Sequence, residues 1–231
     1  MSLNDWYQDF ISLFYPNLCW SCEEIIYQSG EGICPKCVLT LPYTNFHDDV
    51  ENIVNKVFWG RLPLMGATAL FYFNKQTRVQ QLIHKLKYKD KPQVGVLLGQ
   101  MLGSQLLKSE IFKVIEVVVP VPLHPAKKQK RGYNQAAKIA EGIANSMDII
   151  YEEDGMIRTK HTETQTRKTR AERVKNMRGV FTANPKSNLE GKNILLVDDV
   201  LTTGSTLESC ALELLQVPNI KIWIATLAYA E

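Results

Sequence analysis

Hydrophobic residues along the chain form two alternating patterns. Continuous apolar runs predict strands buried on both faces of a parallel sheet, and apolar residues at helical spacing predict amphipathic helices between them. The predicted strands cover residues 67–73, 114–121 (apolar apart from Glu116), 193–200 and 221–228, with a weaker one at 155–158. The predicted helices cover residues 79–86, 94–102, 136–144 and 207–215. Strands that alternate with helices predict βαβ units and a mostly parallel, doubly wound α/β sheet.

The pattern differs in the first quarter of the chain. Residues 3–14 place apolar and aromatic side chains at helical spacing, which predicts a short amphipathic helix. Residues 38–65 show no regular period and are expected to be irregular. We therefore expect a small N-terminal unit over residues 1–60 and one α/β domain over residues 61–231.

Composition adds two expectations about location and one about charge. The chain has 231 residues, of which 45% are hydrophobic and 22% charged, as is ordinary for a globular protein. No apolar run approaches the ~20 residues needed to cross a bilayer, so no membrane span is expected. The first residues include Asp5 and Asp9 and lack a basic start, which predicts a cytoplasmic protein without a secretory signal. The net charge of +3 is too small to indicate nucleic-acid binding by itself.

Four of the five cysteines form two CxxC pairs, Cys19 with Cys22 and Cys34 with Cys37. Four thiolates make the closed tetrahedral shell of structural zinc and leave no position for a catalytic water. Two disulfides are the alternative, but disulfides are rare in cytoplasmic proteins. A redox CxxC usually occurs singly, beside a thioredoxin-like βαβ unit. We therefore predict a small ribbon that binds structural Zn²⁺, and we expect Cys210 to be a buried apolar residue.

Residues 195–206 read LLVDDVLTTGST, an apolar strand followed by two acids, a hydroxyl-rich loop and a helix. N–H groups at a helix N-terminus bind phosphate, and Gly204 allows the backbone to approach the anion. Ionised carboxylates accept hydrogen bonds from the 2- and 3-hydroxyls of a ribose. The sequence therefore predicts a ribose 5-phosphate site. Its acids are Asp198 and Asp199, and its phosphate-binding residues are Thr202, Thr203, Gly204, Ser205 and Thr206.

A cationic loop is predicted after the strand that ends at residue 121. Pro120 and Pro122 stiffen the exit from the strand, and Asn134 is placed to cap the next helix. The cations in between are Lys127, Lys128, Lys130 and Arg131. Ligands of parallel sheets bind beyond the carboxyl ends of the strands, so this loop should face the hydroxyl-rich loop. Its cations would stabilise the charge that grows on a pyrophosphate leaving group. A further basic turn, residues 85–92, lies between the first two predicted helices.

The charged stretch 158–178 has no apolar period and contains eight basic residues against Glu163 and Glu172. It could be a hood that closes over the polyanion and excludes water. It could equally be a patch for nucleic-acid phosphates, and a plain solvated helix is the third interpretation. Gln165 is a candidate hood residue.

Residues 195–206 closely resemble the fingerprint of the type I phosphoribosyltransferases, and the chain as a whole resembles the ComF (competence or GntX-type) family. The motifs that carry the resemblance, in order, are the CxxC quartet at 19–37, VPVPLHP at 119–125, RGYNQA at 131–136, the TQT and Arg173–Asn176 neighbourhood, and the run at 196–206. Family members commonly have Phe where Tyr133 stands. The resemblance implies an α/β fold with a type I phosphoribosyltransferase-like parallel sheet flanked by helices and a small N-terminal zinc ribbon.

The resemblance also implies a cytoplasmic role linked to DNA uptake, with a helicase-like competence protein as partner in some bacteria. The leading interpretation is a Mg²⁺-dependent phosphoribosyltransferase, a glycosyltransferase, that binds phosphoribosyl pyrophosphate and displaces pyrophosphate from the anomeric carbon. Its acceptor and general base are not identified by the sequence, and no glutamine amidotransferase half is present to supply ammonia. The alternative is a non-catalytic module that binds single-stranded DNA or a protein partner and keeps the phosphoribosyl site as a ligand sensor.

Overall fold

The computed structural model describes residues 16–26, 32–75, 77–88, 91–159 and 179–230. The helix predicted at residues 3–14 lies outside the described residues, as does all of the charged stretch beyond Thr159 up to Arg178. Within the described residues, no helix is long and apolar enough to cross a membrane.

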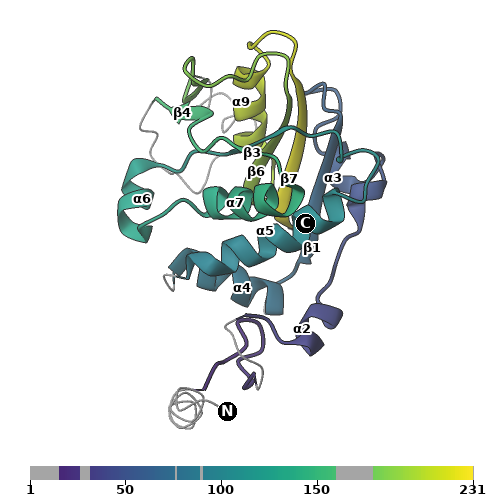
Figure 1. Ribbon diagram of the computed structural model, residues 1–231, viewed down its shortest axis with the longest axis vertical. Coiled ribbons are helices and arrows are strands. Elements are labelled where there is room, and N and C mark those ends of the chain that lie inside the picture. Colours follow the sequence, from purple (N-terminus) through teal and green to yellow (C-terminus); the bar gives the residue numbers. More distant parts are fainter. Residues whose placement is uncertain (1–15, 27–31, 76, 89–90, 160–178, 231) are drawn as a thin grey trace.

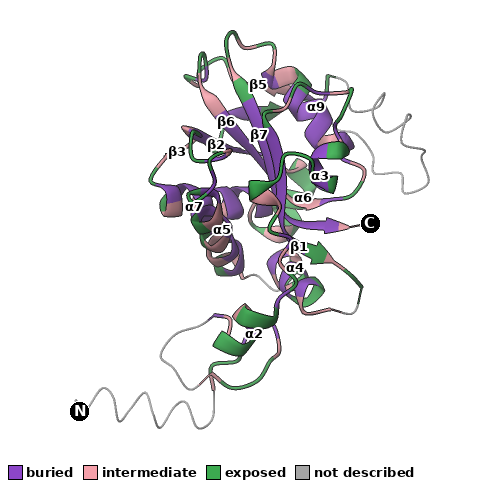
Figure 2. Ribbon diagram, turned by 90° about the vertical axis from the view of Figure 1, so that its right-hand side faces the viewer, coloured by how far each residue is buried: buried purple, intermediate pink, exposed green. Residues whose placement is uncertain are grey.

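A five-stranded parallel sheet forms the centre of the molecule (Figure 1). Its strands, in spatial order, are β1 (Gly66–Phe73), β7 (Lys221–Ala230), β6 (Asn193–Leu201), β2 (Val117–Pro120) and β3 (Ile150–Tyr151). The central strands are almost fully buried, since helices cover both faces (Figure 2). This confirms the predicted parallel α/β sheet and explains why its strands read as continuous apolar runs.

Two separate apolar cores lie on the two faces of the sheet. One is built with α4 (Arg78–Tyr88), α5 (Pro92–Leu106) and α7 (Gln135–Met147). The other is built with α9 (Ser205–Leu214), the short helix α3 (Ile53–Lys56) and the hairpin of β4 (Met156–Arg158) and β5 (Phe181–Ala183). Figure 2 shows α5 and α7 on one side of the sheet and α9 on the other, so the sheet is doubly wound as predicted.

Helices α5 and α7 cross unusually closely, because glycines stand at the contact. A Cβ atom at Gly99 would lie 2.2 Å from the backbone oxygen of Ile139, and one at Gly142 would lie 2.1 Å from that of Val96. Any side chain at either position would force the helices apart. Gly95 and Gly103 lie one turn to either side of Gly99 in α5, and a Cβ at either would also meet α7. The periodic apolar residues predicted both helices, but the spacing between them depends on these glycines.

Two stretches differ from the prediction. Strand β2 begins at Val117 rather than at residue 114, because residues 110–114 form turns, in which the N–H groups of Lys113 and Ile115 donate to the carbonyls of Ser109 and Phe112. Residues 38–65 are not wholly irregular, since they hold the end of α2 (Pro35–Thr40), the 3-10 helix η1 (Phe46–Asp48) and α3. One-turn helices hold too few residues to show a period.

The four cysteines lie in a small ribbon at one end of the molecule, below α4 in Figure 1. We use "cysteine ribbon" for residues 16–26 and 32–41, which include α2. Residues 46–58 instead pack beside β1, where the Asn52 amide donates to the carbonyl of Ala67 at 2.9 Å. The boundary at residue 60 remains a prediction.

Candidate functional site

The connections between strands run in opposite directions on the two sides of the β2–β6 pair, and we call the space beyond the carboxyl ends of these two strands the crevice. From β2 the chain passes through α7 to β3 on one side, and from β6 it passes through α9 to β7 on the other side. Ligands of doubly wound sheets bind beyond the carboxyl ends of the strands at such a point. Two of the predicted site segments, residues 121–134 and 202–206, follow these two strands. The topology therefore brings them together, although they are about 70 residues apart in the chain.

Asp198 and Asp199, here called the acidic pair, lie near the carboxyl end of β6, which extends to Leu201. The Asp198 carboxylate accepts from the backbone N–H of Asp199 at 2.8 Å. Asp199 instead forms an ion pair with Lys87 of α4, with Oδ2 and Nζ 2.8 Å apart. The two acids therefore have different partners, one in its own strand and one in a distant helix.

The pKa of Asp198 is raised to about 7, first by burial and then by the neighbouring charge of Asp199. The Asp199 N–H and the ammonium groups of Lys87 and Lys127 act in the opposite direction. Lys127 is one of the predicted pyrophosphate-binding cations, so its positive charge acts on the acid at the end of β6. A carboxyl group that changes charge near neutral pH is common in functional sites.

Residues 202–206, here called the hydroxyl loop, connect β6 to α9. Gly204 has a left-handed φ of +75° and is the residue before the first turn of the helix. A Cβ atom at Gly204 would lie 2.9 Å from the ring of Phe58, so the glycine is required by packing as well as by conformation. The hydroxyls of Thr203 and Ser205 are 3.0 Å apart. The loop thus places hydroxyl groups beside the N-terminus of α9, where donors to a phosphate are expected.

Two residues from the N-terminal part of the chain, Phe58 and Arg61, contact the start of α9. Glu208 is buried, and its carboxylate forms an ion pair with Arg61 at 2.5 Å. The Arg61 guanidinium also lies over the ring of Phe58, 5.4 Å from its centre. Phe58 and Arg61 therefore form the wall behind the hydroxyl loop. No periodic pattern marked these residues, because they come from the stretch expected to be irregular.

The predicted cationic loop after β2 is a helix, α6 (Pro125–Arg131). His124 caps its first turn, Pro125 occupies the first helical position, and Gly132 ends it with a φ of +78°. These three signals were available in the sequence, but α6 buries none of its residues and so shows no apolar period. As predicted, Asn134 caps α7, accepting from the N–H of Ala136 at 3.1 Å.

Lys130 and Arg131 of α6 line a pocket together with Lys87, Tyr88 and Gly132. We call this space, of about 350 Å³, the cationic pocket. The Arg131 guanidinium lies over the ring of Tyr88, 5.2 Å from its centre. The Tyr133 hydroxyl donates to the carbonyl of Leu86, which ties the segment after α6 to the end of α4. Lys127 and Lys128 are not among the lining residues.

The sequence did not assign Lys87 and Tyr88 to the site. They belong to the basic turn at residues 85–92, which precedes the acidic pair by more than 100 residues. The only signal was the local excess of lysines, and that excess does not show which lysine faces the acids. Lys85, two residues earlier, pairs instead with Glu23 of the cysteine ribbon at 2.8 Å.

The stretch predicted as a hood, residues 158–178, connects β4 to β5. Only Arg158 and Thr159 of it are among the described residues, and Gln165 is not. Its two ends are held together, because the N–H of Thr159 donates to the carbonyl of Val180 at 2.7 Å. Arg158 lies over the ring of Phe181, 5.2 Å from its centre, and burial lowers its pKa. Arg158 is therefore part of the base of the hairpin.

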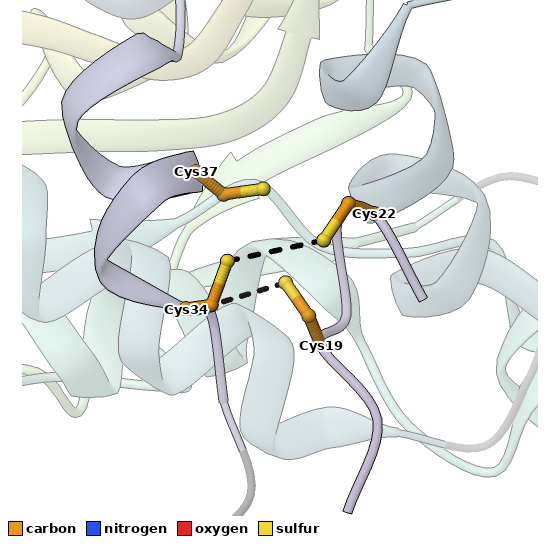
Figure 3. A group of neighbouring side chains, drawn as sticks. All are labelled: Cys19, Cys22, Cys34 and Cys37. Atoms are coloured by element: carbon orange, nitrogen blue, oxygen red, sulfur yellow. Dashed lines mark hydrogen bonds between the residues drawn. The ribbon is translucent and has the colours of Figure 1, made fainter. Parts of the chain in front are cut away.

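The sulfur atoms of Cys19, Cys22, Cys34 and Cys37 all lie within 4.8 Å of one another (Figure 3). Four sulfurs around one zinc ion at ~2.3 Å each would be ~3.8 Å apart, and those of Cys22 and Cys34 are 3.8 Å apart. None of the five cysteines is joined in a disulfide, so the disulfide alternative is not what the structure shows. The cluster could hold a metal ion such as zinc. Cys210 is fully buried, as expected.

The surroundings of the cluster shift the pKa values of its thiols in different directions. Burial acts to raise the pKa of Cys19, but backbone N–H groups of Cys34, Cys22 and Ser21 outweigh it and lower that pKa to about 6. Two of these donors lie 3.3 Å (Cys34) and 3.4 Å (Ser21) from the Cys19 sulfur. Burial raises the pKa of Cys37 to about 12. Metal binding must displace the protons of such a cluster, and the ion would supply the positive charge that the buried sulfurs lack.

The cysteine ribbon packs against the helix that carries Lys87. Trp20, between the first two cysteines, is buried in the same apolar core as Leu82 and Leu86 of α4. The Glu23–Lys85 ion pair adds to this contact, and Lys91, three residues after the end of α4, lies over the Trp20 ring, 5.8 Å from its centre. One face of α4 therefore touches the ribbon, and its last turn reaches the acidic pair.

A family model for the phosphoribosyl transferase domain matches residues 129–230. The match begins within α6 and includes the acidic pair, the hydroxyl loop, Lys130 and Arg131. Lys87, Tyr88 and the cysteine ribbon lie outside it.

Curated relatives match over most of the chain. Competence protein F of Haemophilus influenzae is 31% identical over 228 residues, which cover 91% of this chain and 96% of that protein. The DNA utilization protein YhgH of Escherichia coli K12 is 25% identical over 229 residues, covering 91% and 97%. Competence protein ComFC of Bacillus subtilis is 36% identical over 199 residues, covering 86% and 78%.

Among solved structures, the glutamine phosphoribosylpyrophosphate amidotransferase from B. subtilis, complexed with ADP and GMP, is 22% identical with a TM-score of 0.40. The match covers 61% of the present chain and 30% of that chain, so the present chain corresponds to under a third of the amidotransferase.

Proposed function

The chain belongs to the ComF family of phosphoribosyltransferase-like competence proteins, and from this premise we propose that it binds phosphoribosyl pyrophosphate with Mg²⁺ in the crevice between β2 and β6. The observation that supports this most directly is the arrangement of charges around the crevice. The acidic pair and the hydroxyl loop lie at the end of β6, and the cationic helix α6 follows the adjacent strand β2. A ribose that carries phosphate at both ends requires such an order of groups.

Each part of the crevice has a role in this proposal. The hydroxyl loop and the N-terminus of α9 hold the 5-phosphate through N–H and O–H donors. Asp198 and Asp199 accept hydrogen bonds from the 2- and 3-hydroxyls of the ribose. Lys130 and Arg131, with Lys127 and Lys128 on the same helix, supply positive charge for the pyrophosphate. The carboxylate oxygens of Asp198 and Asp199 also make the acidic pair suitable for Mg²⁺. When bound, Mg²⁺ would neutralise part of the pyrophosphate charge.

The reaction we propose is a displacement at the anomeric carbon. The bond from C1 to the pyrophosphate oxygen breaks with its electron pair leaving on pyrophosphate, while an acceptor nucleophile forms a new bond to C1 and loses a proton. Positive charge develops on the ribose as the bond breaks, and the nearby carboxylates stabilise it. Negative charge grows on the leaving group, and the cations of α6 stabilise that.

We propose that the cysteine ribbon binds one structural Zn²⁺ ion through its four thiolates. The names of the relatives, which refer to competence and to DNA utilization, suggest that the phosphoribosyl chemistry serves the uptake or use of DNA. A non-catalytic role follows if the ligand is bound but not turned over. The site would then act as a ligand sensor in a module that contacts single-stranded DNA or a helicase-like partner in the cytoplasm.

Calorimetry with phosphoribosyl pyrophosphate, with and without Mg²⁺, tests the site. The wild type should bind the ligand, more tightly with Mg²⁺. The Asp198→Asn/Asp199→Asn double variant should lose at least about 100-fold in affinity, since two charged acceptors are removed at ~1.5–3 kcal/mol each. Asp154→Asn, which changes an exposed acid outside the crevice, is the matched control. Equal binding by wild type and double variant would contradict the proposed site.

Release of pyrophosphate in the presence of a library of nucleophiles tests the reaction. Release that depends on both the nucleophile and the acidic pair supports a transferase. Binding without release by any nucleophile favours the sensor role and leaves the binding site in place.

A further inference from the structure

The cationic pocket is formed by two segments that are distant in the chain, the last turn of α4 and the end of α6. Its lining consists of three cations, Lys87, Lys130 and Arg131, together with Tyr88 and Gly132. No acidic side chain is among these lining residues. A pocket of about 350 Å³ with three positive charges is suited to a compact polyanion.

Lys87 is the residue that connects this pocket to the acidic pair. Its ammonium group lies 2.8 Å from Oδ2 of Asp199, and its side chain also lines the pocket. The Lys87 side chain is 22% exposed and that of Asp199 is 16% exposed, so both charges are shielded from bulk water. Partly buried charges of this kind interact more strongly than surface pairs, and neither is easily left without a partner.

The position of the last turn of α4 is fixed from two sides. The Tyr133 hydroxyl donates to the carbonyl of Leu86, directly before Lys87. On the other side, Lys85 pairs with Glu23 of the cysteine ribbon. The stacking of Arg131 on Tyr88 then joins the two walls of the pocket. Lys87 is therefore held between the acid and the pocket by contacts on both neighbouring residues.

We infer that Lys87 binds the pyrophosphate end of phosphoribosyl pyrophosphate in the cationic pocket, and that it exchanges Asp199 for the ligand when the ribose is bound. This inference rests on the proposed function. With the ribose at the acidic pair and the 5-phosphate at the hydroxyl loop, the pyrophosphate on C1 must extend away from that loop. Lys87 stands between the acidic pair and a polyanion pocket, which is where the first phosphate after C1 would lie.

The exchange leaves both Lys87 and Asp199 with a partner. Without ligand, Lys87 neutralises Asp199. With ligand, Asp199 accepts hydrogen bonds from ribose hydroxyls instead. The N–H groups of Lys87 then donate to phosphate oxygens. A lysine that only served as a counter-ion for Asp199 would instead affect every ligand that contacts the acidic pair, whether or not it carries a pyrophosphate.

Calorimetry in the presence of Mg²⁺ with phosphoribosyl pyrophosphate, ribose 5-phosphate and inorganic pyrophosphate separates these roles. We expect Lys87→Met to lose about tenfold or more in affinity for both pyrophosphate-containing probes, the equivalent of one charged hydrogen bond. Its affinity for ribose 5-phosphate should stay within about twofold of wild type. Lys113→Met is the matched control, because Lys113 is exposed and pairs with Glu110 outside the cationic pocket, and its three affinities should match wild type.

Lys130→Met provides a second test from the opposite wall, where an exposed side chain can be removed without loss of packing. It should show the same selective loss. An equal loss of ribose 5-phosphate and phosphoribosyl pyrophosphate in Lys87→Met would overturn the inference, because Lys87 would then act through Asp199. Unchanged affinities in Lys87→Met would overturn it too. If the wild type binds none of the three probes, the proposed function itself fails.

Discussion

The two sides of the crevice are built in different ways. At the end of β6, the acidic pair and the hydroxyl loop come from consecutive residues, and the fold of that segment is a strand followed by a helix. On the other side, the cationic pocket combines the end of α4 with the end of α6, about 40 residues later in the chain. The first side is a local motif, whereas the second exists only because distant helices pack against each other.

The two sides of the crevice therefore depend on different structural supports. The hydroxyl loop needs its own backbone conformation and the wall made by Phe58. The cationic pocket needs α4 in place, and α4 is held by the cysteine ribbon and by the crossing of α5 with α7. Changes to the supports of α4 should therefore weaken binding of the pyrophosphate end. Changes at the hydroxyl loop should weaken binding of the 5-phosphate, which ribose 5-phosphate and phosphoribosyl pyrophosphate share.

Removal of the metal from the cysteine ribbon should have the largest effect. Metal binding to four cysteines stabilises a small ribbon by about 10 kcal/mol or more, so the ribbon should lose its structure on chelation. The contacts of Trp20 and Glu23 with α4 would be lost with it. We expect hydrogen exchange to speed up in α4 but not in β6, and affinity for phosphoribosyl pyrophosphate to fall more than affinity for ribose 5-phosphate.

Restoring Zn²⁺ should reverse both effects. A chelated protein with unchanged exchange in α4 would show that the ribbon does not support the pocket. An equal loss of both ligands would show that the two sides of the crevice are not independent.

Gly99→Ala should come next, through the crossing of α5 and α7. The new Cβ would lie 2.2 Å from the Ile139 oxygen, so the helices must separate. Overpacking of this kind costs about 3 kcal/mol, which chemical denaturation would measure as a lower free energy of unfolding. Gln100→Ala, at the adjacent exposed position of α5, should leave that free energy within about 0.5 kcal/mol of wild type. A Gly99→Ala protein as stable as Gln100→Ala would mean that the close crossing is not required.

Gly204→Ala should have a smaller effect on stability, at the local side of the crevice. A left-handed φ costs an alanine about 1 kcal/mol, and contact with Phe58 should add about as much again. Because the hydroxyl loop must shift, we expect affinities for ribose 5-phosphate and phosphoribosyl pyrophosphate to fall together, by about tenfold.

Gly191→Ala is the matched control for this change. Gly191 also has a left-handed φ, +70°, but a Cβ there would meet nothing within 4 Å. Gly191→Ala should lower the free energy of unfolding by the cost of the left-handed φ alone. Its affinities for both ligands should match wild type. Equal affinities in the Gly204→Ala and Gly191→Ala proteins would show that the position of the hydroxyl loop does not matter for the phosphate.

Asp198→Asn should have the smallest effect on stability, and the effect should depend on pH. The pKa of Asp198 is raised to about 7 in the folded protein, so folding binds a proton that the unfolded chain releases above about pH 4. Wild type should therefore lose stability relative to Asp198→Asn as pH rises from about 4 to about 8. Because Asp198 is only half-buried, we expect a difference of about 1–2 kcal/mol at pH 8.

Denaturation of both proteins at pH 4 and pH 8 measures this difference. The two should be equally stable at pH 4, and Asp198→Asn should be the more stable at pH 8. Asp154→Asn, which changes an exposed acid outside the crevice, should show no such gain. A constant difference between wild type and Asp198→Asn at both pH values would contradict a raised pKa.

Much of the fold could be predicted from periodic apolar residues. They gave the strands and helices of the doubly wound sheet, because each element buries a regular face. Elements without a regular buried face were missed: α6 has no buried residue, and α3 is a single turn, too short to show a period. The start of β2 was misplaced because the apolar Val114 belongs to a turn that precedes the strand.

The sequence by itself indicated the parts of this protein whose proposed roles depend on neighbouring residues. The four cysteines and the run at 195–206 are of this kind, because a metal shell or a phosphate loop needs set residue types at short spacing. Only the tertiary structure decided which side of α4 each lysine faces. Lys85 and Lys87 are alike in sequence, yet one pairs with the ribbon and the other with Asp199. Their difference arises from packing between segments that are distant in the chain, and no local pattern carries that information.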